Sequence, residues 1–195
     1  MNRPEYQHQP LDEYVSLLYH WNRRIRLVGE KDPETFRRKH LGEVVAAFGV
    51  LASVDWQLAI DIGSGNGLVA VPLALTNPTR HVIAMEPRQK KCAFLRMVRH
   101  ELGLTNLEVA ATRLETFVAP AGARMVWTAR ALEITPALLV SVLRRHPGDH
   151  LLLFSGETSP ATRVLTAGRE ILSVISRQRS AADPQRTVTL ARILG

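Results

Sequence analysis

The chain has 195 residues, which is enough for one domain with a full hydrophobic core and an N-terminal extension. Its formal net charge of +7 predicts an anionic partner, most simply nucleic acid, with a solvated basic surface as the alternative. The single cysteine, Cys92, excludes an internal disulfide and a cysteine-cluster metal site, and we expect it to pack in a helix. No signal-peptide pattern opens the chain and no run approaches about 18 apolar residues, so we expect a cytoplasmic protein without a membrane span.

Two helices are predicted before the first strand, and we assign residues 1–55 to this extension and residues 56–195 to the main domain. Apolar residues recur at steps of three and four from Leu11 to Ile25, and the end of this segment is basic, with Arg23, Arg24 and Arg26. A second helix begins at Asp32-Pro33, and its outer face carries Arg37, Arg38 and Lys39 beside His40. These basic side chains could contact phosphates or could simply be solvated, and the sequence favours neither role. A lone histidine such as His40 is more often a packed or surface residue than a catalytic one.

The main domain is organised around a glycine-rich turn between a strand and a helix. A buried strand is predicted at residues 58–62 and a helix at 68–75, with Gly63, Gly65 and Gly67 between them. Glycines there permit positive φ and let a ligand lie against bare backbone. The next apolar run, residues 81–85, ends in Glu86, where an acid can bind the ribose hydroxyls of a nucleotide-like cofactor.

The glycine spacing favours one class of cofactor. Dinucleotide-binding folds use G-x-G-x-x-G, whereas this turn reads G-x-G-x-G. Asp61, two residues before the first glycine, would repel a pyrophosphate but suit the ammonium of a methionine moiety. We therefore expect S-adenosylmethionine (SAM). The alternatives are an ordinary glycine-rich turn of another α/β protein and, less favoured by the spacing, a nicotinamide oxidoreductase.

Beyond Glu86, predicted strands and helices alternate, which indicates one doubly wound sheet. A helix closed by Gly103 follows, then a strand at 107–111 and a strand at 125–129 that ends in Arg130. Further elements are a helix at 136–145, a strand at 151–154 and a helix at 159–167. Residues 171–176 and 188–193 are expected to form a terminal antiparallel pair, with the polar segment 178–186 as a mobile loop.

Several motifs together resemble one family. They are LLYHWN (17–22), a basic helix with His40, DIGSGNG (61–67), KKCAFLRMVRHELGL (90–104), TRLETF (112–117) and ARAL (129–132). From about residue 11 to 156 the chain resembles the GidB/RsmG family of SAM-dependent methyltransferases, which modify a guanine N7 in small-subunit ribosomal RNA. The resemblance implies a Rossmann-like class I methyltransferase fold, SAM as cofactor, and ribosomal RNA or the small ribosomal subunit as partner. We expect the protein to be a monomer.

The expected site residues fall into two groups and include no metal ligands. For the cofactor we expect Asp61, Gly63, Ser64, Gly65, Gly67, Leu68, Glu86, Pro87, Arg113, Leu114, Glu115 and Arg130. For RNA we expect Arg23, Arg24, Arg26 and His40. The resemblance gives Arg113 and Arg130 positioning roles between cofactor and RNA. Their structural alternatives are a surface arginine for Arg113 and, for Arg130, an ion pair with a helix, for example through Glu133.

Departures from the family gather on the substrate side. They are Arg26-Leu27-Val28, Gly42-Glu43, Val69-Ala70, Arg124-Met125 and Ser155-Gly156. Where the family has a lysine, Ser155 offers no charge, and we expect another cation, such as Arg124 or Arg163, to replace it. Two alternatives stay open: a non-catalytic RNA- or ribosome-binding relative, and a methyltransferase that acts on a small molecule or a protein.

The predicted reaction explains why no triad or paired carboxylate is visible in the sequence. Guanine N7 has a lone pair and no proton, so its methylation needs no general base. Catalysis can then consist mainly of positioning, which is worth up to about 7–11 kcal/mol in favourable cases.

Overall fold

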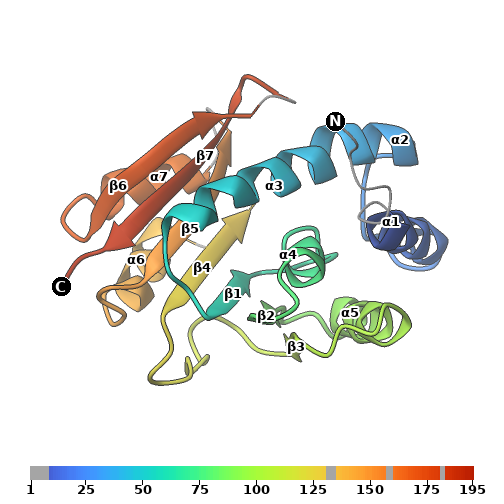
Figure 1. The fold of residues 1–195 in the computed structure, drawn as a ribbon, viewed down its shortest axis with the longest axis horizontal. Coiled ribbons are helices and arrows are strands. Elements are labelled where there is room, and N and C mark those ends of the chain that lie inside the picture. Colours follow the sequence, from blue (N-terminus) through green and yellow to red (C-terminus); the bar gives the residue numbers. More distant parts are fainter. Residues whose placement is uncertain (1–8, 131–134, 157–159, 181–182) are drawn as a thin grey trace.

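The computed structural model of the protein describes residues 9–130, 135–156, 160–180 and 183–195, and contains a seven-stranded sheet (Figure 1). The strands are β1 (Leu58–Ile62), β2 (His81–Met85), β3 (Leu107–Ala110), β4 (Met125–Arg130), β5 (His150–Gly156), β6 (Leu172–Arg179) and β7 (Arg186–Ile193). Their order is β3-β2-β1-β4-β5-β7-β6. The first five strands are parallel, and β7 pairs antiparallel with both β5 and β6. The predicted doubly wound sheet with a terminal antiparallel pair is confirmed.

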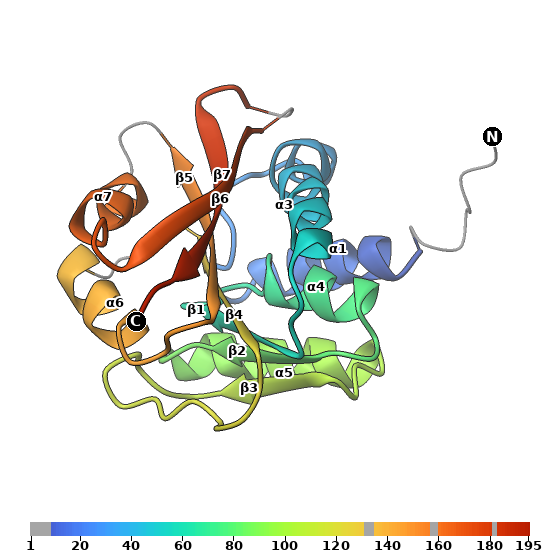
Figure 2. The ribbon, with the colours of Figure 1, turned by 60° about the vertical axis from the view of Figure 1, so that its left-hand side comes forward.

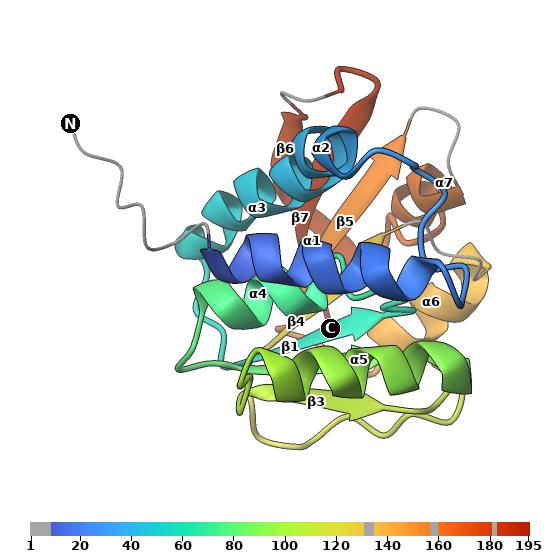
Figure 3. The same cartoon turned by 90° about the vertical axis from the view of Figure 1, so that its right-hand side faces the viewer.

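Helices cover both faces of this sheet. They are α1 (Gln9–Asn22), α2 (Pro33–Phe36), α3 (Gly42–Ala47), α4 (Ala70–Thr76), α5 (Gln89–Glu101), α6 (Pro136–Leu143) and α7 (Pro160–Ala167). Figure 2 shows α6 and α7 on one side of the sheet and α1, α3 and α4 on the other. Figure 3 looks onto α1, α4 and α5, which lie side by side.

The N-terminal helices share a hydrophobic core with the sheet. Tyr14, Val15 and Leu18 of α1 are fully buried in the same cluster as Val71 of α4 and Phe94 of α5. A second cluster, under α6 and α7, fills the opposite face of the sheet. The hydrophobic core is therefore continuous across residue 55. The division of the chain at this residue remains a prediction.

The parallel register brings the functional end of the sheet together. Ile62 of β1 lies beside Met85 of β2 and Ala129 of β4. The residues at these strand ends, Asp61, Glu86 and Arg130, therefore meet at one edge. This carboxyl edge is where open α/β sheets bind their ligands.

Three predicted boundaries need correction. The helix after the glycine turn begins at Ala70, because residues 66–69 form turns before it. The second N-terminal helix is interrupted by a π-helical turn at Arg37–Leu41, where the Gly42 N–H bonds the Arg37 carbonyl, and it ends in a 3-10 segment at Phe48–Ser53. The polar segment predicted as a loop at 178–186 is shorter at both ends, because β6 runs to Arg179 and β7 starts at Arg186.

Some predictions fall on residues that the structure does not describe. They concern Glu133, the last two residues of the ARAL motif, residue 159 at the start of a helix, and positions 181–182 of the polar segment. Within the described ranges, no helix is long and apolar enough to cross a membrane.

Candidate cofactor and substrate site

The glycine turn is shaped by a buried acid at the end of the neighbouring strand. Gly63 and Gly65 have φ values of 65° and 62°, which only glycine adopts without strain. The Gly65 N–H donates to Glu86 Oε2 at 2.9 Å, and the Arg88 N–H donates to Oε1 at 2.9 Å. Glu86 is 3% exposed, so its carboxylate orders the turn as well as facing the adjacent cavity.

Gly67 has a different role from the other two glycines. A Cβ at this position would lie 2.7 Å from Leu95 Cδ2 and 2.8 Å from Val71 Cγ2, and φ is +83°. The residue lines none of the three described cavities. Its observed contribution is the close packing of the turn on α4 and α5.

Two cavities meet at the turn. The larger, of about 470 Å³, is lined by six of the twelve residues expected to bind the cofactor. Its walls include apolar side chains of Ile62, Met85 and Leu138, together with the predicted residues Gly63, Glu86, Pro87, Arg113, Leu114 and Glu115. Leu114 is buried, whereas Arg113 and Glu115 are exposed.

The smaller cavity, of about 170 Å³, is lined by Asp61, Gly63, Ser64, Gly65, Leu68 and Arg130, all of them predicted, with Leu27, Asn66, Val69 and Lys91. Gly63 and Lys91 line both cavities. Three buried polar atoms of this lining have no hydrogen-bond partner among the described residues: Asp61 Oδ2, Ser64 Oγ and Arg130 Nε. An acceptor, a hydroxyl and a cationic donor thus remain available to a polar ligand.

Burial dominates the electrostatics of Asp61. Its residue is 2% exposed, and its Oδ1 accepts a hydrogen bond from Thr128 Oγ1 at 2.8 Å. Desolvation raises the pKa of the carboxyl from 3.8 to about 6, against the opposing effect of nearby Ser64 and Thr128. The group is therefore costly to ionise in the folded protein and would gain from a cationic partner.

Arg130 is held by a buried acid from the N-terminal helices. Glu43 Oε2 accepts from Arg130 Nη2 and from Arg186 Nη1, each at 3.2 Å, and the Glu43 side chain is 1% exposed. Arg130 Nη2 also lies 3.3 Å from His40 Nδ1. The ion pair with a helix that we considered for Arg130 is thus present, and its partner is Glu43. The suggested partner, Glu133, lies outside the described residues.

Burial and the two arginines lower the pKa of His40. Its imidazole is consequently neutral at physiological pH, and its Nδ1 can accept a hydrogen bond from Arg130 Nη2. His40 also packs edge-on against Phe36. The structure therefore associates His40 with Arg130 at the cofactor edge, apart from its expected grouping with Arg23, Arg24 and Arg26.

The N-terminal extension contacts the glycine turn directly. The fully buried Tyr14 hydroxyl donates to the Asn66 carbonyl at 3.0 Å, and Asn66 Nδ2 donates to the Leu27 carbonyl at 3.3 Å. Asn22 Oδ1 accepts from the Leu27 and Val28 N–H groups, which fixes the loop after α1. The sequence analysis did not predict a role at the site for Tyr14, Glu43 or Arg186. The LLYHWN motif includes Asn22, but the sequence did not indicate what this residue does.

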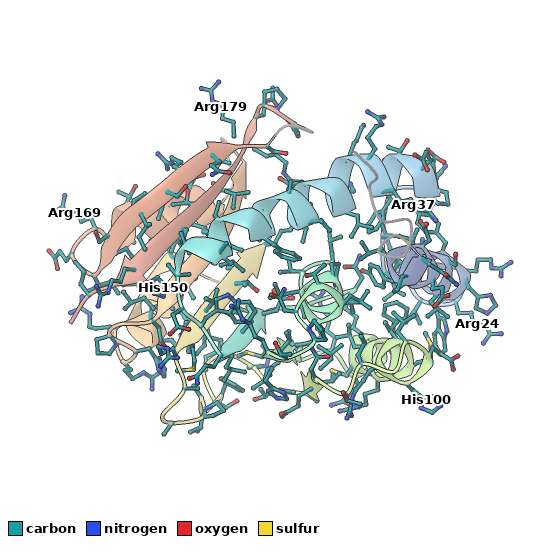
Figure 4. All side chains as sticks on the ribbon, in the orientation of Figure 1. Arg24, Arg37, His100, His150, Arg169 and Arg179 are labelled. Atoms are coloured by element: carbon teal, nitrogen blue, oxygen red, sulfur yellow. The ribbon has the colours of Figure 1, made fainter. Side chains whose placement is uncertain are left out.

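The three arginines after α1 have different surroundings. Arg23 Nη2 bonds His20 Nδ1 at 2.9 Å, and Arg24 lies over the Trp21 ring at 6.0 Å. Figure 4 places Arg24 beside α1 and α5. Arg24 and Arg26 line a third cavity, described below, whereas Arg23 does not.

Neither expected substitute for the missing lysine lines one of the three described cavities. Ser155 is 5% exposed and donates to the Thr187 carbonyl at 3.4 Å, within the β5–β7 pair. Arg124 precedes β4, so it lies at the opposite edge of the sheet, where it pairs with Asp55 at 2.8 Å. Arg163 is exposed on α7, whereas Arg186, opposite Gly156 in the sheet register, is the cation that reaches Glu43.

No group of three or more His, Cys, Asp or Glu side chains within the described ranges could hold a metal ion.

Comparisons with known proteins agree on one family. The model of the GidB family, described as rRNA small subunit methyltransferase G, matches residues 7–177. A ribosomal RNA small subunit methyltransferase G from Sodalis glossinidius (strain morsitans) is 30% identical over 187 residues, which cover 94% of this chain and 89% of that protein. A protein of the same name from Serratia proteamaculans (strain 568) is 36% identical over 116 residues, covering 60% of this chain and 55% of its own length.

Solved structures show the same fold at low sequence identity. The S-adenosylmethionine-dependent methyltransferase SibL in its apo form matches with a TM-score of 0.62 and 18% identity, over 96% of this chain and 70% of that one. A mutant of MtNAS in complex with S-adenosylmethionine matches with a TM-score of 0.62 and 12% identity, over 97% of this chain and 76% of that one. These likenesses establish the Rossmann-like class I methyltransferase fold. Because the family model covers most of the chain and a relative matched over 89% of its length is 30% identical, this protein belongs to the GidB family.

Proposed function

We propose that this chain transfers the methyl group of SAM to N7 of a guanine in small-subunit ribosomal RNA. One observation carries the proposal: two cavities share Gly63, and the smaller contains an unpaired acid oxygen, an unpaired hydroxyl and an unpaired guanidinium nitrogen among the described residues. Membership of the GidB family supports the ribosomal substrate.

The donor set fits SAM. In the smaller cavity, Asp61 would hold the ammonium of the methionine moiety, and Arg130 and Ser64 would hold its carboxylate. In the larger cavity, the apolar walls suit an adenine ring, and Glu86 lies where ribose hydroxyls would come. An ammonium beside Asp61 would also offset the cost that burial imposes on ionising this carboxyl.

The bound cofactor supplies a methyl group already activated on a sulfonium. The protein therefore needs to bind and orient the two reactants and to exclude water. Glu43 fixes the guanidinium groups of Arg130 and Arg186 and offsets one of their two charges. That compensation suits a reaction in which the guanine gains positive charge, because uncompensated cations beside N7 would oppose it.

On the RNA side, the exposed Arg113 lies at the mouth of the larger cavity, where it can contact the substrate. We keep Arg24, Arg26 and His40 in the proposed RNA-facing set, with His40 acting next to Arg130, and leave out Arg23, whose guanidinium bonds His20. We further propose that the protein works as a cytoplasmic monomer on ribosomal RNA or the small ribosomal subunit.

The test combines binding with transfer of label. Calorimetry should give micromolar-range binding of SAM and of its demethylated product, and Gly65→Val should abolish it by placing a branched side chain in the cavity wall. Incubation with radiolabelled SAM and separated ribosomal subunits, RNA and protein fractions should then label small-subunit RNA. Binding of NAD in place of SAM would refute the assignment of SAM as the cofactor. Label in protein, or none at all, would favour a retargeted or non-catalytic relative.

A further inference from the structure

A third cavity, of about 490 Å³, lies next to the proposed cofactor site and has no role in it. It lies between the loop after α1 and the start of α5, and Figure 3 shows these two helices side by side. Its lining is Arg24, Ile25, Arg26, Leu27, Arg88, Gln89, Lys90 and Lys91. Five of these eight residues are cationic and none is acidic.

The positive charge of four of these cations, Arg24, Arg26, Lys90 and Lys91, has no counter-charge among the described residues. Within the described ranges, Arg26, Lys90 and Lys91 form no ion pair, and the contact of Arg24 with the Trp21 ring leaves its charge in place. The first turn of α5, a 13-residue helix, adds its partial positive charge to the same wall. A concave site of one sign concentrates the field and attracts anions.

The surroundings indicate which anion enters. Lys91 lines all three cavities. Arg88 also lines the larger of the two cavities at the glycine turn, and Leu27 also lines the smaller one. The basic cavity therefore borders the place where an acceptor base would approach the cofactor. SAM carries no phosphate, but a nucleic-acid backbone entering this site brings phosphates with it, and arginine and lysine are their usual partners.

We propose that this basic cavity binds a backbone phosphate of the RNA substrate close to the acceptor nucleotide. The inference rests on the proposed function for the identity of its ligand. It adds Lys90 and Lys91 of the α5 side to the RNA-binding surface, while Arg23, whose guanidinium bonds His20 outside the cavity, is not part of that surface.

Arg23 provides a matched control for the experiment. Arg23→Gln and Arg26→Gln each remove one charge from an exposed side chain in the same segment, but only Arg26 lines the cavity. Binding of small-subunit RNA to the full chain is measured over a series of salt concentrations for these variants and for Lys90→Gln. Arg26→Gln and Lys90→Gln should each weaken binding roughly three- to tenfold. Each should also reduce the slope of log K against log salt by about 0.7–0.9.

The control and a second readout separate the two proposals. Arg23→Gln should keep the wild-type slope, and all three variants should keep wild-type SAM affinity in calorimetry. Equal losses in Arg23→Gln and Arg26→Gln, or no loss in Arg26→Gln, would overturn the phosphate site even if the wild type methylates RNA. Selective loss in Arg26→Gln and Lys90→Gln, without label transfer by the wild type, would keep the phosphate site and overturn the methyltransferase. A wild type that binds no RNA overturns both.

Discussion

Replacing Asp61 by asparagine is expected to remove a loss of stability that the wild type undergoes between about pH 4 and 7. Burial raises the pKa of this carboxyl from 3.8 to about 6, so the folded protein holds the proton more tightly than the unfolded chain. The resulting stabilisation is complete below about pH 4 and is lost as the pH rises through about 6. A difference of about 2 pKa units, at 1.36 kcal/mol each, amounts to about 3 kcal/mol at neutral pH.

Urea unfolding of the wild type and Asp61→Asn, at several pH values between about 4 and 8, measures this effect. The stability of the variant minus that of the wild type should grow by roughly 2–3 kcal/mol between pH 4 and 7. The cost of burying an amide is independent of pH, so it cancels from this change. A difference that stays constant with pH would show that the pKa of Asp61 is not raised and would refute the reasoning.

The same substitution tests the proposed ammonium contact. If Asp61 must be ionised to hold the cofactor, SAM affinity of the wild type should fall below about pH 6, by up to about tenfold per pH unit. Asp61→Asn should bind SAM more weakly at pH 7 and lose this pH dependence in calorimetry. Equal affinity of the two proteins at pH 7 would assign Asp61 a purely structural role.

Three further changes test other parts of the site. Gly67→Ala should cost about 1–3 kcal/mol in urea unfolding, because its methyl group would collide with α5 at positive φ. Gly65→Ala, where a Cβ would meet its neighbours only at 3.7 and 3.8 Å, should cost less, and equal losses would contradict the packing role. Glu43→Gln should cost about 2–4 kcal/mol in the same assay, because two arginines lose their buried counter-charge; a loss below about 1 kcal/mol would mean that solvent screens them. In the radiolabel assay, Ser155→Lys should change methyl transfer little while Arg130→Ala reduces it sharply; a large gain from lysine would indicate a weak or retargeted enzyme.

The sheet could be predicted from the sequence because its signals are local. Short apolar runs end in glycine, an acid or arginine, and these marks located β1, β2 and β4 to within a residue. Parallel pairing then places the strand ends at one edge without further information. The cofactor half of the site followed from this placement, since Asp61, Gly63, Glu86 and Arg130 all lie at or beside strand ends.

The substrate half depends on contacts that have no local signal. The partner of Arg130 is Glu43, 87 positions earlier, and the second arginine on that carboxylate is 143 positions from it. The sequence suggested a nearby acid, Glu133, because spacing along a helix is the only clue available before the fold is known. The error over Arg124 was avoidable, because a residue that precedes a parallel strand must lie at the edge opposite the site.

The N-terminal helices are part of the proposed active site, although the sequence reads as an extension followed by a domain. Tyr14 of α1 supports the glycine turn through the Asn66 carbonyl, and Glu43 of α3 fixes Arg130 at the end of β4. Asn66 in turn bonds Leu27, whose loop forms one wall of the basic cavity. A ligand that holds the turn would therefore also restrain the loop proposed to meet RNA. Cofactor and RNA would bind to two sides of one hydrogen-bonded unit, so a cut at residue 55 would divide the binding site itself.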